Sequence, residues 1–188
     1  SNPAQPIKLG QIILPRVARD IHVSGNYAYV ADGDLRVINI SDPGNLKEIG
    51  SCDVDAYRVY VSGDYAYVIS WNDRLWVIDI SEPENPHKVS YFDIPNRIGG
   101  NIYVLENYAY VISDRTGLKI IDASDPHNLS LIGSYDTFGR DIYVSGGYAY
   151  VAGDGLEIVD VSDPQNPSQV SSYKIEGASG IYISGSYA

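Results

Sequence analysis

Arginines at related positions of a repeated sequence are the residues best suited to bind a ligand. Arg19, Arg58 and Arg140 stand at or just before the short apolar segments that open successive repeats, and Arg97 precedes another such segment in "FDIPNRIGGN". Guanidinium groups that converge bind anions strongly, so this set could hold an anion or an acidic sugar. Trp71, in "SWNDRL", could stack on a sugar or anchor a partner. The alternative is structural: the arginines pair with neighbouring aspartates, and the tryptophan folds back over its own sheet.

Acidic hairpins are a second candidate site, for a metal ion. The segments "ADGDL" and "AGDGL" place Asp32, Asp34 and Asp154 in short turns, and carboxylates are the ligands that Ca²⁺ prefers. The ligand number and spacing of a known calcium loop are missing, however, and Asp-Gly is favoured in tight hairpin turns. We therefore predict no metal and no cofactor, and assign these aspartates to turn formation.

The sequence offers few residues for catalysis. The three histidines occupy unrelated positions of the repeat, and the single cysteine has no histidine in its own repeat; these residues are His22, His87, His127 and Cys52. No glycine-rich phosphate loop and no Gly-x-Ser-x-Gly segment occurs. We predict that the chain is not an enzyme, and a site assembled from distant loops is the third alternative for its function.

All of these residues belong to a repeat of about 40 residues. The first tyrosine of the segment "YAYV" recurs at Tyr27, Tyr65, Tyr108 and Tyr148, and Tyr187 begins another copy in "SYA". Each repeat holds four short strand-like segments separated by Gly, Pro and Asp turns, without helical periodicity. Four-stranded units at this period are typical of a β-propeller, so we predict an all-β propeller of four-stranded antiparallel blades.

The third strand of each repeat predicts how the sheets pack. In "LKIIDAS", Leu118 and Ile120 share one face of the strand, whereas Ile121 and Ala123 share the other. Both faces are therefore apolar, which requires a neighbouring sheet on each side. Blades packed radially around an axis meet this requirement.

The boundaries follow from the repeat, within one domain that spans residues 1–188. Residues 1–22 supply the end of an incomplete blade and the first inner strand. Complete repeats cover about residues 23–60, 61–103, 104–143 and 144–183, and residues 184–188 begin a truncated copy. We expect about four complete blades and a partial blade built from the two termini.

Composition limits the partners. The formal net charge of −11 repels phosphate backbones, so we predict no nucleic-acid binding. No apolar run is long enough for a membrane span. Seventeen tyrosines against two phenylalanines suit half-buried strands, in which the ring packs and the hydroxyl reaches water.

The third strands and the turns after them resemble a known repeat. The segments "LRVINIS", "LWVIDIS", "LKIIDAS" and "LEIVDVS" are similar to the LVIVD repeat, and "SDPGNL", "SEPENP", "SDPHNL" and "SDPQNP" match its turn. Asn39 departs from the aspartate found at Asp79, Asp122 and Asp160. The resemblance implies a bacterial or archaeal propeller, and many such proteins are exported or lie on the cell surface, mostly without assigned catalysis.

The two ends do not supply a whole blade. Residues 1–14 read as a turn and a fourth strand, whereas "GIYISG" reads as a first strand, so strand three and most of strand two have no residues. We expect the exposed edge to be covered by further repeats of a longer chain or by another copy of this chain. The two alternatives are compatible, and the sequence leaves both open. The residues predicted at this assembly edge are Ile7, Leu9, Ile12, Ile181, Ile183 and Tyr187.

These observations favour a non-catalytic structural protein, outside the cell or on its surface. We expect it to assemble by strand pairing at the open blade, and a head-to-tail contact that does not close would build a filament. The alternative is a recognition module that binds a glycan or a protein at the axial mouth formed by the arginines.

Overall fold

Short antiparallel strands account for all the regular secondary structure that the chain adopts within residues 5–94, 100–113, 115–175, 177–185 and 187–188, which the computed structural model describes. Residues of each "YAYV" strand alternate between two apolar faces, as the β-branched and tyrosine-rich sequence favours. Gly and Asp-Pro turns end the strands at regular intervals. Within these ranges, no helix has the length and apolar character that a membrane span requires.

The strands form four four-stranded units, which we call blades 1 to 4. Blade 1 holds β1 (Asp20–Ser24), β2 (Tyr27–Ala31), β3 (Gly33–Asn39) and the first half of β4 (Lys47–Ser62). Blade 2 holds the second half of β4, then β5 (Tyr65–Ser70), β6 (Arg74–Asp79) and β7 (His87–Asp93). Because β4 serves both blades, backbone pairing joins β1 to β7 in one seven-stranded sheet.

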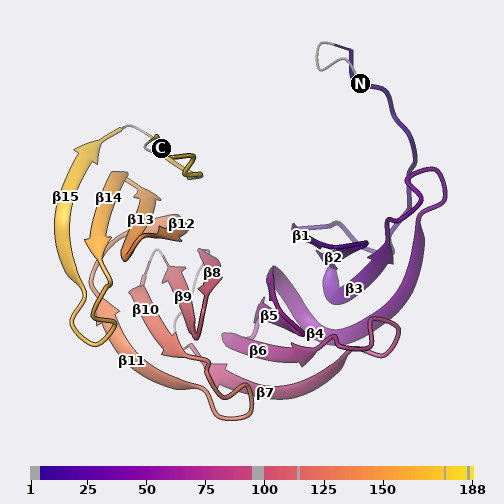
Figure 1. Cartoon of the computed structure of the whole chain (residues 1–188), viewed down its shortest axis with the longest axis horizontal. Helices are drawn as coiled ribbons and strands as arrows, with labels where there is room; N and C mark the ends of the chain where they lie inside the picture. Colours follow the sequence, from indigo (N-terminus) through magenta and orange to yellow (C-terminus); the bar gives the residue numbers. More distant parts are fainter. Residues whose placement is uncertain (1–4, 95–99, 114, 176, 186) are drawn as a thin grey trace.

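The other two blades are separate four-stranded sheets. Blade 3 holds β8 (Asn101–Leu105), β9 (Tyr108–Ser113), β10 (Gly117–Asp122) and β11 (Ser130–Tyr135). Blade 4 holds β12 (Gly139–Ser145), β13 (Tyr148–Gly153), β14 (Gly155–Asp160) and β15 (Ser168–Lys174). The four blades follow one another along an open arc, with the first strand of each blade on the inner side (Figure 1). The all-β propeller architecture that the repeat predicts is therefore confirmed, whereas the arc does not close into a ring.

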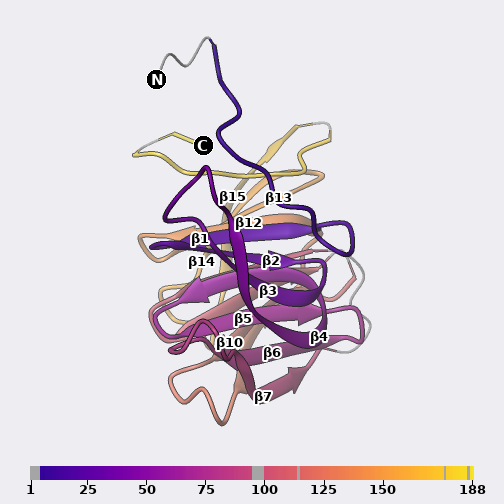
Figure 2. The same ribbon diagram turned by 90° about the vertical axis from the view of Figure 1, so that its right-hand side faces the viewer.

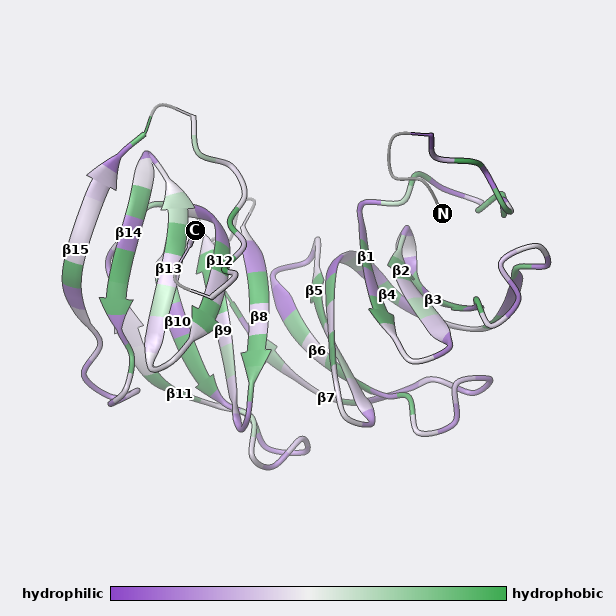
Figure 3. Cartoon of the chain, turned by 45° about the horizontal axis from the view of Figure 1, so that its top comes forward, coloured by the Kyte–Doolittle hydropathy of each residue, from purple (hydrophilic) through white to green (hydrophobic). Residues whose placement is uncertain are grey.

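The core lies between the blades. We call the face of a blade that looks toward the next blade its forward face, and the opposite face its rear face. Leu35 and Val37 on the forward face of blade 1 pack against Val59, Val61 and other rear-face residues of blade 2. Corresponding clusters join blade 2 to blade 3 and blade 3 to blade 4. Hydrophobic residues recur along the strands of every blade (Figure 3), as two buried faces require.

The aspartates that end the third strands stabilise the turns that follow them. Asp79, Asp122 and Asp160 each accept a hydrogen bond from the backbone amide of the serine two residues later, at 2.8, 2.9 and 2.9 Å. Asn39 makes the same contact to the amide of Ser41, at 3.0 Å, so the departure from aspartate keeps the turn. Hydrogen bonds from the serines lower the pKa of all three carboxyl groups.

The two terminal segments differ from the prediction. Residues 5–14 and 177–183 are not in strands, although a fourth and a first strand were expected there. The physical reason is that the ladder partners of both segments are the missing second and third strands, and a strand without a neighbour has no backbone hydrogen bonds to hold it. The N-terminal segment from residue 5 onward and the C-terminal segment lie on opposite sides of the opening of the arc (Figure 1), and the N-terminal segment extends beyond the sheets (Figure 2).

Candidate functional site

Aromatic rings line the inner side of the arc. One ring from the first strand of each blade packs on the next, and a ring of the C-terminal segment continues the row, with centroid separations of 4.5, 5.0, 4.9 and 5.6 Å; the rings belong to His22, Tyr60, Tyr103, Tyr143 and Tyr182. Burial lowers the pKa of His22 and raises the pKa of Tyr60 and Tyr103. The uncharged forms are therefore favoured, and the row is a packed lining rather than a set of acid–base groups.

Polar side chains at the starts of the first strands tie each blade to the next. Asp20 Oδ2 accepts from the amide of Val59 at 2.9 Å, and Asp141 Oδ2 accepts from the amide of Ile181 at 2.8 Å, one repeat later in each case. Asn101 Nδ2 donates to Asp141 Oδ1 at 2.5 Å. Burial raises the pKa of Asp20, although the amides of Val59 and Ile21 and the nearby Arg58 act in the opposite direction. A shallow hollow of about 240 Å³ is lined in part by these polar side chains, Asp20, Asn101 and Asp141.

Arg19, Arg58 and Trp71, three of the predicted mouth residues, come together. The Arg19 guanidinium lies 5.8 Å from the centroid of the Trp71 ring, and Tyr57 contacts Trp71 edge to face at 4.4 Å. Arg58 lies 4.3 Å from the centroid of Tyr57, and its Nη1 donates to the carbonyl of Arg19 at 3.3 Å. This cation–π cluster joins blades 1 and 2 and borders a cavity of about 260 Å³.

The remaining predicted mouth residues are not in this cluster. Arg140 lies over the ring of Phe138, at 5.6 Å, in the segment that leads into blade 4. Arg97 lies outside the described residues. The structure therefore gives a two-arginine cluster beside one tryptophan, and a mouth formed by arginines from several blades is not observed among the described residues.

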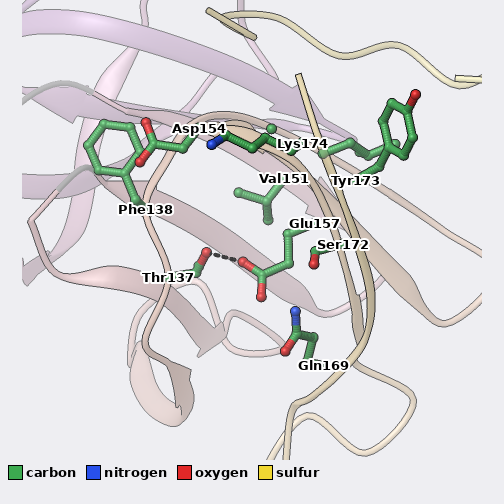
Figure 4. A pocket seen from close by; sticks show the side chains of 11 residues that line it. Thr137, Phe138, Val151, Asp154, Glu157, Gln169, Ser172, Tyr173 and Lys174 are labelled. Carbon is green, nitrogen blue, oxygen red and sulfur yellow. Dashed lines mark hydrogen bonds between the residues drawn. The ribbon is translucent and has the colours of Figure 1, made fainter. Parts of the chain in front are cut away.

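A cavity of about 350 Å³ beside blade 4 was missed by the sequence reasoning. The Glu157 carboxylate lies in it and accepts hydrogen bonds from Thr137 and, at 2.9 Å, from the Tyr135 hydroxyl, with Gln169 nearby (Figure 4). Trp76 occupies the position of Glu157 in blade 2 and packs on Tyr91 at 4.9 Å. The signal available in the aligned repeats is that Glu157 is shorter than the side chains at the same position of the other blades, Arg36, Trp76 and Lys119.

The candidate catalytic residues do not gather. Within the described part of the chain, no group of three or more His, Cys, Asp or Glu residues could hold a metal ion. Asp32 and Asp34, considered for calcium, instead bind Arg36 at 2.7 and 2.8 Å. Burial raises the pKa of the Cys52 thiol, which disfavours the reactive thiolate.

The forward face of blade 4 has no neighbouring blade. In blades 1 to 3, the third-strand leucines Leu35, Leu75 and Leu118 are fully buried, whereas Leu156 of blade 4 is only half-buried. On the outer strand, Val170 and Tyr173 are 55% and 70% exposed. This face is apolar because it has the sequence of an internal blade, yet it meets solvent.

The rear face of blade 1 is exposed in part. Ile21 and Val23 of its inner strand are 59% and 56% exposed, although the corresponding residues of the later blades are buried. The residues predicted at the assembly edge divide between covered and exposed positions: Ile7, Leu9 and Tyr187 are exposed, Ile181 and Ile183 are half-buried, and Ile12 packs against blade 1. The open arc thus ends in one free forward face and one partly free rear face.

Radial four-stranded blades with apolar faces define a propeller-type repeat protein. The family model described as the LVIVD repeat matches residues 15–54, 55–93, 97–137 and 139–175. These matches cover most of the sequence, and the chain belongs to the LVIVD repeat family. No curated protein matches this sequence at a significant level.

Solved structures share the fold at low sequence identity. A candidate 6-phosphogluconolactonase from Bacteroides fragilis NCTC 9343 superposes with a TM-score of 0.73 at 14% identity, over 87% of this chain and 56% of its own. A second one, from Bacteroides uniformis ATCC 8492, gives 0.68 at 18% identity, over 82% and 56%. The computationally designed Ika4 protein gives 0.65 at 9% identity, over 82% of this chain and 97% of its own. The chain thus spans about half the length of the two natural structures, and the likeness concerns the fold alone.

Proposed function

We propose that this chain is a non-catalytic structural propeller unit that joins further blades through its exposed faces, outside the cell or on its surface. The observation that carries the proposal is the unpaired forward face of blade 4. Its residues correspond to those that are buried between blades elsewhere in the same chain. A face made for burial stays exposed only at an energetic cost, so a partner that covers it is favoured.

The size of this cost supports association. An apolar face of roughly 400 Å² corresponds to about 10 kcal/mol of transfer free energy at the usual burial coefficient. Association loses several kcal/mol of translational and rotational freedom, so only part of this appears as affinity. The burial term is thus of the same order as the cost of association, so it favours a contact without fixing its affinity.

The rear face of blade 1 is the complementary surface that the chain itself offers. A contact between the forward face of one copy and the rear face of another is heterologous, because different surfaces meet. Repetition of such a contact gives a ring if the rotation closes and a filament if it does not. Added blades of a longer chain would satisfy the same face.

Self-association of the chain tests the proposal directly. Light scattering and electron microscopy of the wild-type chain should show dimers or larger species, and the double variant Val170→Asp/Tyr173→Ser should be monomeric. Leu131→Asp is the matched control, since Leu131 is 45% exposed on the outer strand of blade 3, away from both faces. A wild-type chain that stays monomeric at all accessible concentrations would contradict self-assembly.

A recognition role is the second candidate, and the cation–π cluster favours it. Arg19, Arg58 and Trp71 come together on a strongly acidic protein, and Arg19 and Trp71 line a cavity. Such a cluster could bind an acidic sugar. Binding to an array of uronic-acid and sulfated oligosaccharides should be lost in Arg19→Ala/Trp71→Ala and kept in Arg140→Ala. Equal binding by both variants would exclude this site.

An enzyme is the third candidate. Two similar structures carry the name of a lactone hydrolase, but the inner aspartates of this chain already accept hydrogen bonds from backbone amides. We therefore give catalysis no role in the proposal.

A further inference from the structure

The outer strands of blades 1 to 3 each place a small residue against a proline turn of the following blade. A Cβ atom added to Gly50 or to Gly133 would lie closer than 3.0 Å to the carbonyl oxygen of Pro83 or Pro164, respectively, which is nearer than real Cβ atoms approach. At the corresponding position of blade 2, Ser90 donates its hydroxyl hydrogen bond to the carbonyl of Pro126 at 2.5 Å. The contact is therefore a repeated element of the interface between blades, and it accepts only glycine or a serine that donates.

The N-terminal segment makes the same contact on blade 1. A Cβ on Gly10 would collide with the carbonyl oxygen of Pro43. Ile12 and Leu14 pack on a rear-face cluster formed by Ala28, Val30 and Ile38. Residues 9–14 thus occupy the place that the outer strand of a preceding blade would take, although they belong to no sheet.

This segment covers only the outer half of the rear face. Ala28, Val30 and Ile38 are buried beneath it, whereas Ile21 and Val23 on the inner strand stay exposed. A whole blade would cover both halves, as the internal interfaces do. The segment therefore covers a smaller part of the same surface than a whole blade would.

The outer strand of blade 4 carries the matching residues without a partner. Val170, Ser171 and Tyr173 of β15 align with Val89, Ser90 and Phe92 of β7, which pack against blade 3. Ser171 is exposed, and its hydroxyl has no hydrogen-bond partner in the described part of the chain. It is the one serine of this class that meets no proline carbonyl there.

We propose that β15 of one copy docks on blade 1 of a second copy, displaces residues 9–14 and donates the Ser171 hydroxyl to the carbonyl of Pro43. This inference rests on the proposed self-association and specifies its partner, its register and its competitor. A second copy is the occupant because its blade 1 supplies the same type of rear face that covers the forward faces of blades 1 to 3. The N-terminal segment competes with this contact and so limits it.

The test is a substitution that detaches residues 9–14 from blade 1 without deleting them. In Gly10→Val the new side chain collides with the Pro43 carbonyl, so the segment leaves blade 1. Gln11→Ala is the matched control, because Gln11 is exposed and, among the described residues, its side chain is hydrogen-bonded only to Lys8 of the same segment. Analytical ultracentrifugation should give a dissociation constant at least tenfold lower for Gly10→Val than for wild type and Gln11→Ala. Circular dichroism confirms that each variant is folded.

Two further measurements decide the register. Gly10→Val/Ser171→Val should lose most of the gain, because valine cannot donate a hydrogen bond to the Pro43 carbonyl. A synthetic peptide of residues 5–16 should weaken the association of Gly10→Val. Equal dissociation constants for Gly10→Val and Gln11→Ala would overturn the competing role of the segment while leaving self-association intact. Failure of every variant to associate would overturn the proposed function as well.

Discussion

The buried ion-pair cluster of blade 1 allows a quantitative prediction. Arg36, on β3, binds Asp32 at 2.7 Å, Asp34 at 2.8 Å and Glu48 at 2.8 Å. The Asp32 side chain is fully buried, whereas those of Asp34 and Glu48 are 23% and 32% exposed. Loss of the arginine therefore matters most at Asp32, whose charge would remain buried; within the described part of the chain, its one remaining donor is the amide of Asp34, at 3.2 Å.

Arg36→Met keeps the length of the side chain and removes its charge. Breaking one side of a buried pair costs about 3–5 kcal/mol, and the more exposed pairs add about 0–1 kcal/mol. We expect urea unfolding to show a loss of about 3–5 kcal/mol, a large part of the roughly 5–15 kcal/mol that holds a domain together.

A second substitution tests the cause of this loss. Asp32→Asn in the Arg36→Met background should recover a large part of it, because the amide is neutral and its oxygen still accepts from Asp34. A loss below about 1 kcal/mol in the single variant, or no recovery in the double variant, would show that the buried carboxylate is not the reason.

Three other predictions concern single repeats. Glu106 adopts φ of 54° where the other hairpins have Gly25, Gly63, Gly146 and Gly185, so Glu106→Gly should stabilise the chain by about 0.5–1 kcal/mol in thermal unfolding; a lower melting temperature would contradict this. Hydrogen bonds lower the pKa of Asp79, Asp122 and Asp160. Their stabilisation is therefore complete above the ordinary value of 3.8 and is lost as pH falls through the lower folded values. In the triple Asp→Asn variant, the free energy of unfolding from urea titrations should depend less on pH in the acid range. An unchanged pH dependence would show that these three carboxyl groups do not cause it. Burial lowers the pKa of His22, so folding disfavours its protonation and stability falls as pH drops below 6.5. His22→Tyr should remove this dependence, as chemical denaturation on both sides of that pH would reveal.

Much of the fold follows from the sequence because the same pattern, a strand with two apolar faces that must both be buried, occurs in all four repeats. Alternation in "LKIIDAS" puts apolar residues on both faces, and the structure buries Leu118, Ile120 and Ile121 between blades as predicted. The role of Asp79 and its equivalents follows from local turn chemistry. These features depend on contacts within a repeat or between neighbouring repeats of the same kind.

Features that depend on differences between repeats were harder to predict. The cluster of Arg19 and Trp71 depends on a hairpin of blade 2 that reaches blade 1, and sequence alone gives no direction for that loop. The terminal strands were wrong because a segment can take the position of a strand without its hydrogen bonds, as Gly10 and Ile12 do. The predicted assembly edge, extracellular location and partners stay predictions.

The distribution of indole side chains makes one internal blade of the arc visible by itself. Trp71 and Trp76 both belong to blade 2, whereas tyrosines occur in every blade. Tryptophan emission therefore reports the melting of one blade and its neighbours, and tyrosine emission reports the average. Each blade contacts only the blades beside it, so unfolding that begins at either end should change tyrosine emission and tryptophan emission at different times. The native chain therefore reports the order in which its repeats unfold.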